Sequence, residues 1–246
     1  MKHLYSVAIL AGGLATRLHP LTVTIPKALL EIDGAPFIDH QLRLLYENGI
    51  RHVVLCVGYL GEMIQEHVGD GSRFGMSVEY SYDGPDLLGT GGAIRLAAPM
   101  LGEAFFVMYG DSYLDCDYAA IQAEFARSGK IGMMTVFHNE GQWDTSNIEF
   151  ADKEIIAYHK TERTARMRHI DYGVGMLMQA AIQVIPLQEH YDLAALYQTL
   201  LARQQLAAFE VDKRFYEIGS FAGMKELEYH LAQEKFVTAT TVHDKS

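Results

Sequence analysis

The stretch Val7–Lys27 decides the fold, and it reads Val-Ala-Ile-Leu-Ala-Gly-Gly-Leu-Ala-Thr-Arg-Leu-His-Pro-Leu-Thr-Val-Thr-Ile-Pro-Lys. Its apolar start and the pair Gly12–Gly13 predict a buried strand that ends in a glycine-rich loop. In an open parallel sheet, ligands bind at such a carboxyl end. The glycines let backbone N–H groups approach an anion closely, and Arg17 and Lys27 add two cations. The stretch therefore predicts an anion-binding loop.

The pattern of short apolar runs and helical spacing continues beyond this stretch. Strands are expected at residues 7–10, 53–57, 76–82, 104–109 and 132–137, with helices at 37–48, 60–68, 91–100 and 118–127. Strands that alternate with helices at this rhythm are typical of βαβ units. The chain is therefore predicted to be an α/β protein with a Rossmann-like, open, mixed but mostly parallel sheet and helices on both faces.

The sequence pattern changes after about residue 140, where the predicted strands become shorter and polar turns become more frequent. Strands are expected at 147–150, 155–159, 172–178, 207–211 and 215–218, and helices at 180–185, 192–203 and 221–234. No linker rich in Pro, Gly or Ser separates the two halves. We expect a single domain over 1–236, with a core over about 1–137, a small inserted lobe over about 138–236, and a flexible tail at 237–246.

Composition excludes several classes of protein. The 246 residues include 31 Asp and Glu against 20 Lys and Arg, a net charge of −11, which argues against a nucleic-acid partner. Two cysteines, Cys56 and Cys116, cannot build a disulfide framework. No apolar run approaches the ~18 residues of a membrane span, and the apolar start is too short for a signal peptide. A cytoplasmic protein without a membrane partner is expected, and its oligomeric state (monomer or homodimer) stays open.

Two common phosphate-binding motifs do not fit the first loop. A P-loop needs Gly-Lys followed by Ser or Thr, and neither Gly12 nor Gly13 precedes a Lys. A dinucleotide fingerprint needs glycines spaced as G-x-G-x-x-G, which is absent. The loop instead resembles the G-G-x-G-T-R-L-x-P-L-T signature, with its later P-K pair, of the sugar-1-phosphate nucleotidyltransferases. The matching residues are Gly12, Gly13, Thr16, Arg17, Leu18, Pro20, Leu21, Thr22, Pro26 and Lys27.

The resemblance is to the short bacterial members of that family, and it implies a GT-A-like nucleotidyltransferase fold. Arg17 and Lys27 would be catalytic and would hold the triphosphate and the incoming sugar phosphate. The segment Leu88–Ala93 resembles the family's L-G-T-x-G-A motif, which contacts the base and sugar. The implied nucleotide-binding residues are Leu10, Ala11, Gly12, Gly13, Thr16, Tyr82, Gly89 and Thr90. Ala15 stands where the family has Gly, so Ala is strained there if the position requires φ above zero.

The resemblance also implies a Mg²⁺ cofactor held by two carboxylates. Asp111 follows an apolar strand in a Gly-Asp pair, and from there a carboxylate can reach a metal on phosphate oxygens. Asp115 and Asp117 lie nearby and compete for this role. Glu217, in Phe-Tyr-Glu-Ile-Gly-Ser, takes the place of the family's second aspartate, and its side chain is longer by one methylene.

A second set of residues resembles the family's sugar-phosphate site. It consists of Asn147, Lys160, Asp171 and Gly173. His159 replaces the Glu that usually precedes the lysine, which weakens an expected hydrogen bond to a sugar hydroxyl. The basic run from Arg163 to His169 is either a solvated face or a second anion-binding lid.

The resemblance implies transfer of a nucleotidyl group from an NTP to a sugar 1-phosphate, giving an NDP-sugar and pyrophosphate. We favour GTP with D-glycero-D-manno-heptose 1-phosphate or mannose 1-phosphate. One alternative is uridylyl or cytidylyl transfer to another acceptor, such as N-acetylmuramate 1-phosphate, glucose 1-phosphate or a phosphocholine-like molecule. The other is a non-catalytic protein that binds nucleotide sugars.

Overall fold

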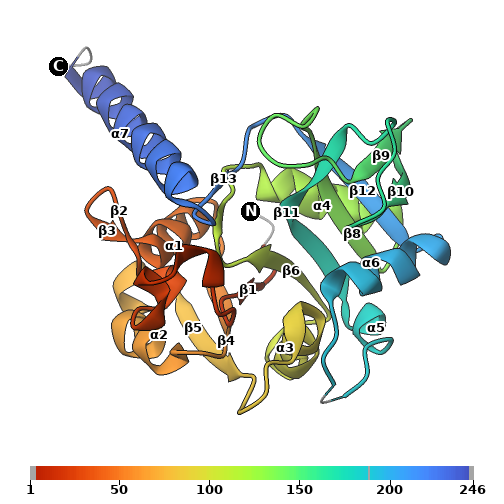
Figure 1. Ribbon diagram of the computed structural model, residues 1–246, viewed down its shortest axis with the longest axis horizontal. Coiled ribbons are helices and arrows are strands. Elements are labelled where there is room, and N and C mark those ends of the chain that lie inside the picture. The colour runs from red at the N-terminus through yellow and green to blue at the C-terminus, as the bar shows by residue number, and fades with distance from the viewer. Residues whose placement is uncertain (1–3, 188, 244–246) are drawn as a thin grey trace.

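The computed structural model describes residues 4–187 and 189–243, and within them nine strands form one sheet (Figure 1). Its central strands are β1 (Val7–Leu10), β4 (His52–Val57), β5 (Ser77–Tyr82), β6 (Ala104–Tyr109) and β11 (His169–Met178). They lie in the order β11-β6-β1-β4-β5. The pairs β1–β4, β1–β6 and β4–β5 are parallel, whereas β11 runs antiparallel to β6. The predicted mixed sheet with a parallel centre is confirmed.

The later half of the chain extends this same sheet through the long strand β11. One edge of β11 pairs with β6 over residues 174–178, and its other edge pairs with β8 over residues 169–171 and 175–177. The added strands are β8 (Gly132–His138), β9 (Ile148–Ala151), β10 (Glu154–Tyr158) and β12 (Leu206–Val211). Because β11 touches strands of both halves, it joins the core to the segment that carries the predicted sugar-phosphate residues.

Helices cover both faces of the sheet, as predicted. One core includes apolar residues of α1 (Phe37–Glu47), α2 (Gly61–Val68) and α4 (Tyr118–Ser128). The other includes residues of α3 (Gly89–Ala97), α5 (Gln179–Ile182) and α6 (Leu193–Ala202).

Side chains of one strand alternate between these two cores. In β4, Val53, Leu55 and Val57 enter the first core, and Val54 and Cys56 enter the second. This alternation explains why the strand is apolar throughout.

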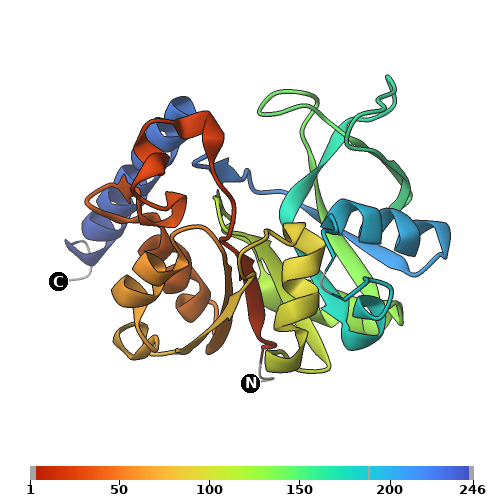
Figure 2. The ribbon, with the colours of Figure 1, turned by 60° about the horizontal axis from the view of Figure 1, so that its bottom comes forward.

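Short elements connect these layers. They are the 3-10 helices η1 (Thr16–Leu18), η2 (Leu21–Val23), η3 (Lys27–Leu29), η4 (Ser72–Phe74) and η5 (Ala98–Met100), and the strands β2 (Glu31–Ile32), β3 (Ala35–Pro36), β7 (Ser112–Tyr113) and β13 (Tyr216–Glu217). In Figure 2 the red segment after β1 and the green and teal loops of the later half stand above the same edge of the sheet. That edge contains the carboxyl ends of β1 and β6, so both predicted groups of site residues face it.

The last helix, α7 (Phe221–His243), is longer than predicted and stands away from the body (Figure 1). The expected helix ended at residue 234, and a flexible tail was expected from 237 onward. That expectation was wrong for residues 237–243, which continue the helix, while 244–246 lie outside the described residues. Neither Gly nor Pro interrupts this stretch, so an established helix can propagate through it. Leu227 and Leu231 anchor α7 on a small core around Phe37. No helix of the described residues is long and apolar enough to cross a bilayer.

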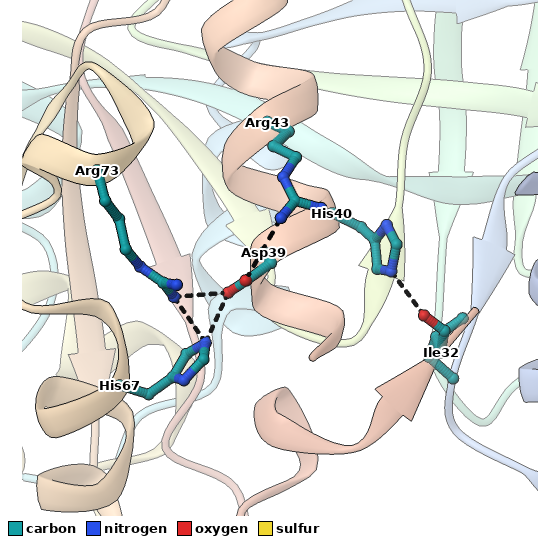
Figure 3. Close-up of polar contacts among 6 residues, drawn as sticks. All are labelled: Ile32, Asp39, His40, Arg43, His67 and Arg73. Carbon is teal, nitrogen blue, oxygen red and sulfur yellow. Dashed lines mark hydrogen bonds and ion pairs between the residues drawn. The ribbon is translucent and has the colours of Figure 1, made fainter. Parts of the chain in front are cut away.

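One polar cluster ties the helices of the first face together (Figure 3). Asp39 on α1 is buried and lies 2.7 Å from Nε2 of His67 on α2 and 3.0 Å from Nη2 of Arg73 on η4. Arg43, one turn further along α1, lies 3.7 Å from the other carboxylate oxygen. We call these four residues the Asp39 cluster. The neighbouring ring of His40 contacts the carbonyl oxygen of Ile32.

Candidate functional site

The main cavity, of about 400 Å³, lies at the carboxyl ends of β1, β4, β5 and β6. The structure brings to it most of the residues predicted to bind nucleotide and metal: Leu10, Ala11, Gly12, Gly13, Thr16, Arg17, Lys27, Gly89, Thr90 and Asp111. Tyr82 is an exception, because its hydroxyl donates to Gln65 Oε1 on α2 at 2.6 Å and its side chain does not line the cavity. The next residue, Asp83, lines the cavity instead.

The loop after β1 contains Ala15, for which the sequence analysis expects strain if its φ is positive. Ala15 has φ of +49° and ψ of +41°, the left-handed region that favours glycine. The hydroxyl of Thr22 donates to the Ala15 carbonyl oxygen at 2.9 Å and so braces the turn. The loop therefore keeps a conformation suited to Gly although it contains Ala.

A close backbone approach places the end of β6 beside the end of β1. The N–H of Gly110 donates to the Leu10 carbonyl oxygen at 3.0 Å, and a Cβ at Gly110 would collide with that carbonyl. Asp111 follows directly and faces the cavity beside the loop. Glycine at position 110 is therefore required for Asp111 to stand next to the loop after β1.

Lys27 and Asp111 form a direct ion pair in the cavity. Lys27 Nζ lies 2.6 Å from Asp111 Oδ2, and the two residues come from η3 and from the loop after β6. Both remain accessible, with side-chain exposures of 14% and 31%. A partly exposed pair of this kind can exchange its partners when a phosphate or a cation arrives.

Glu217 lies beside Asp111 and adds negative charge. It pairs with Ser112 across β13 and β7, and the Ile218 N–H donates to the Asp111 carbonyl oxygen at 2.9 Å. Burial, together with repulsion from Asp111 and Asp144, raises the pKa of Glu217, while Arg17 and Lys27 oppose the shift. Gly219 leaves room for the Arg17 guanidinium, since a Cβ there would lie 3.1 Å from Arg17 Nη2.

These carboxylates fit a divalent cation that is completed by ligand oxygens. The described part of the chain contains no group of three or more His, Cys, Asp or Glu side chains arranged to hold a metal. Mg²⁺, however, is commonly held by one or two carboxylates together with phosphate oxygens and water. The mutual repulsion of Asp111 and Glu217 is what a bound cation would relieve.

The two rival carboxylates near Asp111 have other partners. Asp117 is the N-cap of α4 and accepts the Ala120 N–H at 2.9 Å. Asp115 lies 2.6 Å from Lys213 Nζ. Of the three carboxylates, Asp111 is the one that lines the two cavities.

A smaller cavity of about 180 Å³ adjoins the first, and Tyr109 and Asp111 line both. All four predicted sugar-phosphate residues line it: Asn147, Lys160, Asp171 and Gly173. Most of the other lining residues are acidic or aromatic, namely Asp144, Tyr158, Tyr172, Phe215 and Glu217, and Ser112 and Ile170 complete the walls. Asp111 therefore stands where the contents of the two cavities would meet.

Asp171 is a half-buried carboxylate in the wall of the smaller cavity. Its Oδ1 accepts the Gly173 N–H at 3.0 Å, and the Tyr109 hydroxyl lies 3.5 Å from Oδ2. Burial raises the pKa of Asp171 to about 6, against the opposing effects of the Gly173 N–H and of Lys160. Asp171 therefore titrates near neutral pH.

A bridge of three side chains connects the two cavities. Lys160 Nζ lies 2.5 Å from Asp192 Oδ2, and the Thr90 hydroxyl lies 3.3 Å from Asp192 Oδ1. Asp192 is also the N-cap of α6 and accepts the Ala194 N–H. Although burial disfavours its charge, the bond from Lys160 and the Ala194 N–H hold the pKa of Asp192 below its usual value. Lys160 is thus held by a residue that also contacts Thr90 in the wall of the main cavity.

Three residues of the basic run after Lys160 are paired with carboxylates, and Arg163 donates to the Lys160 carbonyl oxygen at 3.3 Å, which favours the interpretation as a solvated face. Arg166 lies 3.0 Å from Glu149, Arg168 lies 3.9 Å from Glu140, and His169 lies 3.0 Å from Glu210. Trp143 is covered by the Arg214 guanidinium at 3.4 Å from its ring centre and does not line either cavity.

Sequence reasoning missed three acidic residues of the site. Asp83 lines the main cavity, Asp144 lines the smaller one, and Asp192 holds Lys160. Asp192 could have been found as a helix N-cap. Asp83 and Asp144 lie in loops that carry no helix or strand periodicity, so nothing in the pattern distinguished them.

Comparison with known proteins agrees with this geometry. The family model "Nucleotidyl transferase" matches residues 6–146. Mannose-1-phosphate guanylyltransferase catalytic subunit beta of Danio rerio is 28% identical over 218 residues, which cover 86% of this chain and 60% of that protein. D-glycero-alpha-D-manno-heptose 1-phosphate guanylyltransferase of Campylobacter jejuni is 28% identical over 212 residues, 86% of this chain and 93% of that protein.

A third relative differs in its base. N-acetylmuramate alpha-1-phosphate uridylyltransferase of Neisseria meningitidis is 40% identical over 113 residues, 46% of this chain and 49% of that protein. The chain thus spans about half to 60% of the length of two of these relatives. The solved structure of HddC from Yersinia pseudotuberculosis, complexed with GMP-PN, has the same fold, with a TM-score of 0.77, 23% identity and coverage of 93% of this chain and 100% of that one. Since the family model covers more than half of the chain, the protein belongs to the nucleotidyl transferase family.

Proposed function

We propose that the protein transfers a nucleotidyl group from a nucleoside triphosphate to a sugar 1-phosphate and releases pyrophosphate. The observation that carries the proposal is the junction at Asp111. A cavity with Arg17, Lys27 and backbone N–H groups meets a smaller cavity with Lys160 and hydrogen-bonding side chains. One ligand in each cavity would have its phosphate at the junction.

The reaction joins an oxygen of the sugar phosphate to the α-phosphorus and breaks the bond between the α- and β-phosphates. The attacking phosphate is already ionised at neutral pH, so the protein needs no general base. Catalysis then consists of positioning and of neutralising charge. In this proposal Arg17 holds the leaving pyrophosphate, and Lys27 and Lys160 hold the attacking phosphate.

Mg²⁺ fits the same proposal through Asp111 and Glu217. The cation would supply charge neutralisation on the phosphates. Lys27 contacts Asp111 Oδ2, so both residues lie at the junction, where Lys27 would face a phosphate and Asp111 would hold the cation.

The substrates proposed first are GTP with D-glycero-D-manno-heptose 1-phosphate or mannose 1-phosphate. Support comes from the relatives that act on mannose and heptose 1-phosphates. The uridylyltransferase relative supports UTP and N-acetylmuramate 1-phosphate as the alternative pair of substrates.

A second acceptor class is supported by the walls of the smaller cavity. Asp144 and Asp171 stand among Tyr158, Tyr172 and Phe215, with Lys160 as a cation. Acidic and aromatic side chains are the groups that receive a quaternary ammonium. A phosphate ester that carries such a cation, for example phosphocholine, is therefore the second candidate.

Pyrophosphate release in the presence of Mg²⁺ tests the proposal. The four NTPs are crossed with heptose, mannose, glucose and N-acetylmuramate 1-phosphates and with phosphocholine. Release with one sugar 1-phosphate pair is expected. Release with phosphocholine alone would establish the second candidate. If folded protein still binds a nucleotide but releases no pyrophosphate with any of these pairs, it is a non-catalytic binding protein.

A further inference from the structure

Gln41 lies in the middle of the buried side of α1, where an apolar side chain would be expected. Residues three and four positions apart share one face of a helix, and at these distances from Gln41 stand Phe37, Ile38, Leu44 and Leu45, all of them buried. Gln41 itself is only 1% exposed. Its amide must therefore find partners within the protein for the hydrogen bonds to water that burial removes.

The side-chain nitrogen of Gln41 reaches the short turn between β6 and β7. Nε2 donates to the Tyr109 carbonyl oxygen at 3.2 Å and to the Ser112 carbonyl oxygen at 2.8 Å. Between these two carbonyls lie Gly110 and Asp111 alone. A primary amide has two N–H groups on one nitrogen, so it can hold two acceptors at once. Gln41 thus spans the turn that contains Asp111.

Two main-chain hydrogen bonds fix the same turn from other sides. The Gly110 N–H donates to the Leu10 carbonyl oxygen at 3.0 Å, and the Ile218 N–H donates to the Asp111 carbonyl oxygen at 2.9 Å. Both of these bonds join backbone atoms, so they do not depend on a polar side chain. The two bonds from α1 differ, because they exist only if residue 41 has a side chain that can donate twice.

The burial of this amide has a cost to the fold. Its Oε1 atom is buried and has no hydrogen-bond partner among the described residues. An unpartnered buried oxygen lowers stability, whereas a methionine at this position would fill a similar volume without that cost. Methionine, however, could not hold the Tyr109 and Ser112 carbonyls. The choice of Gln41 is explained if the geometry of this turn serves the site.

We propose that Gln41 is a positioning residue, which holds the turn at Asp111 so that the carboxylate is ready to receive a divalent cation. This role rests on the proposed function, since there Asp111 is taken to hold Mg²⁺. Groups that orient a metal ligand typically contribute about 10- to 100-fold to metal affinity or activity. Gln41 acts on the main chain beside the ligand and not on the carboxylate itself, so an effect of about 10-fold is expected.

Mn²⁺ binding tests this role without catalysis. Mn²⁺ accepts the same oxygen ligands as Mg²⁺, and its electron paramagnetic resonance signal measures the ion that stays free when it is titrated into the nucleotide-free protein. Asp111→Asn identifies the part of the binding that depends on Asp111. In Gln41→Met, which removes the donors, the Kd of that part is expected to rise about 10-fold. In the Asp111→Asn background, Gln41→Met should have no further effect on Mn²⁺ binding.

The Mg²⁺ dependence of turnover gives a second measurement. The free Mg²⁺ concentration for half-maximal pyrophosphate release should rise about 10-fold in Gln41→Met. The KM for the NTP at saturating Mg²⁺ should stay within a few-fold of wild type. A role limited to holding the fold together would lower stability and would leave the Mg²⁺ dependence of the folded protein unchanged.

Gln122→Met is the matched control, because it removes another buried amide at a distance from both cavities. Gln122 lies on α4, is 9% exposed, and accepts the Tyr5 N–H at 2.8 Å near the amino end of β1. This variant is expected to lose stability and to keep the wild-type Kd for Mn²⁺. If Gln41→Met does not fold, Gln41→Asn takes its place, since its amide is one methylene too short to hold both carbonyls.

The remaining outcomes separate this role from the proposed function. An unchanged Kd for Mn²⁺ in Gln41→Met, or an equal rise in Gln122→Met, would overturn the role of Gln41. If pyrophosphate release nevertheless occurs, the proposed function stands. Mn²⁺ binding that depends on Asp111 and on Gln41, without pyrophosphate release for any pair of substrates, would preserve the role and reject the proposed function. A wild-type protein that neither binds Mn²⁺ through Asp111 nor releases pyrophosphate would reject both.

Discussion

Asp39 and Asp111 each meet a cation within 3 Å, yet their surroundings differ. Asp39 has a side chain that is 5% exposed, and it is surrounded by His67, Arg73 and Arg43. Asp111 is 31% exposed, meets Lys27 at 2.6 Å, and has the acidic Glu217 as its neighbour.

The comparison separates two uses of the same residue types. In the Asp39 cluster, the positive charge around one carboxylate joins α1, α2 and η4 (Figure 3). At the junction of the cavities, acidic groups accumulate and their charge is only partly balanced. A compensated cluster holds elements together, whereas an uncompensated one gains free energy when a cation or a hydrogen-bond donor binds.

The largest predicted effect comes from breaking the pair at the junction. Replacing Lys27 by Met removes a charge that would face the reacting phosphates. Turnover is expected to fall about 100- to 1,000-fold, as when one electrostatic contact to a transition state is lost. Pyrophosphate release measures turnover, and circular dichroism checks folding. Lys225→Met, at an exposed position on α7, is the control. Turnover within a few-fold of wild type would remove Lys27 from the mechanism.

Exchanging Asp39 for Asn should lower stability and leave turnover unchanged, the reverse of the Lys27 variant. The change leaves His67 and Arg73, whose nitrogens lie 2.7 Å apart, without their shared carboxylate. The free energy of unfolding is expected to fall by about 2 kcal/mol, less than for a fully buried pair because the cations are partly exposed. Urea unfolding measures it, and turnover of the folded fraction should be unchanged. Asp111→Asn is the matched variant and should lose turnover while keeping its stability.

Asp171 should make stability depend on pH. Its pKa of about 6 in the folded protein lies above its usual value of 3.8. The folded state therefore binds the proton more tightly, so this contribution is complete below about pH 4 and is lost as pH rises through about 6. From pH 5 to 8, the stability of the wild type should fall relative to that of Asp171→Asn by about 1–2 kcal/mol. Urea unfolding at both pH values measures the difference, and a constant difference would contradict the prediction.

The smallest effect is expected in the loop itself. Ala15 has a φ of +49°, a conformation that costs an L-residue about 1–2 kcal/mol. Gly removes this strain but adds about 0.5–1 kcal/mol of entropy to the unfolded chain. Ala15→Gly should therefore stabilise the protein by roughly 0.5–1 kcal/mol. Thermal unfolding measures the change, and a destabilised variant would show that the Ala15 methyl makes a favourable contact.

Residue patterns were sufficient to predict features that depend on neighbouring residues in the sequence. The apolar run Val7–Leu10 became the parallel strand β1, and the loop that follows lines the main cavity. The strain expected at Ala15 also had a local basis, because whether a position tolerates a Cβ depends on the φ of that residue alone. Lys160 and Asp171, which the sequence assigned to one site, lie together in the smaller cavity.

The sequence pattern was not sufficient where two adjacent side chains point to opposite sides of a strand end. Tyr82 and Asp83 are adjacent, but the Tyr82 side chain turns to α2 and Asp83 lines the cavity. Successive side chains at a strand end point to opposite sides, so an error of one position reverses the assignment. The length of α7 was missed for another reason, since the polar residues of its end resemble a frayed tail.

The sequence by itself determined the α/β class and the glycine-rich loop with Arg17 and Lys27 after the first strand, because short-range spacing specifies strands, turns and the residues at their ends. Only the tertiary structure decided that Lys160 is held by Asp192, that Asp111 joins two cavities, and that Asp83 Oδ1 is buried without a partner. These facts depend on long-range packing, such as the antiparallel entry of β11 beside β6. Which charges become neighbours, and which are left uncompensated, follows from that packing and is not written in any local pattern.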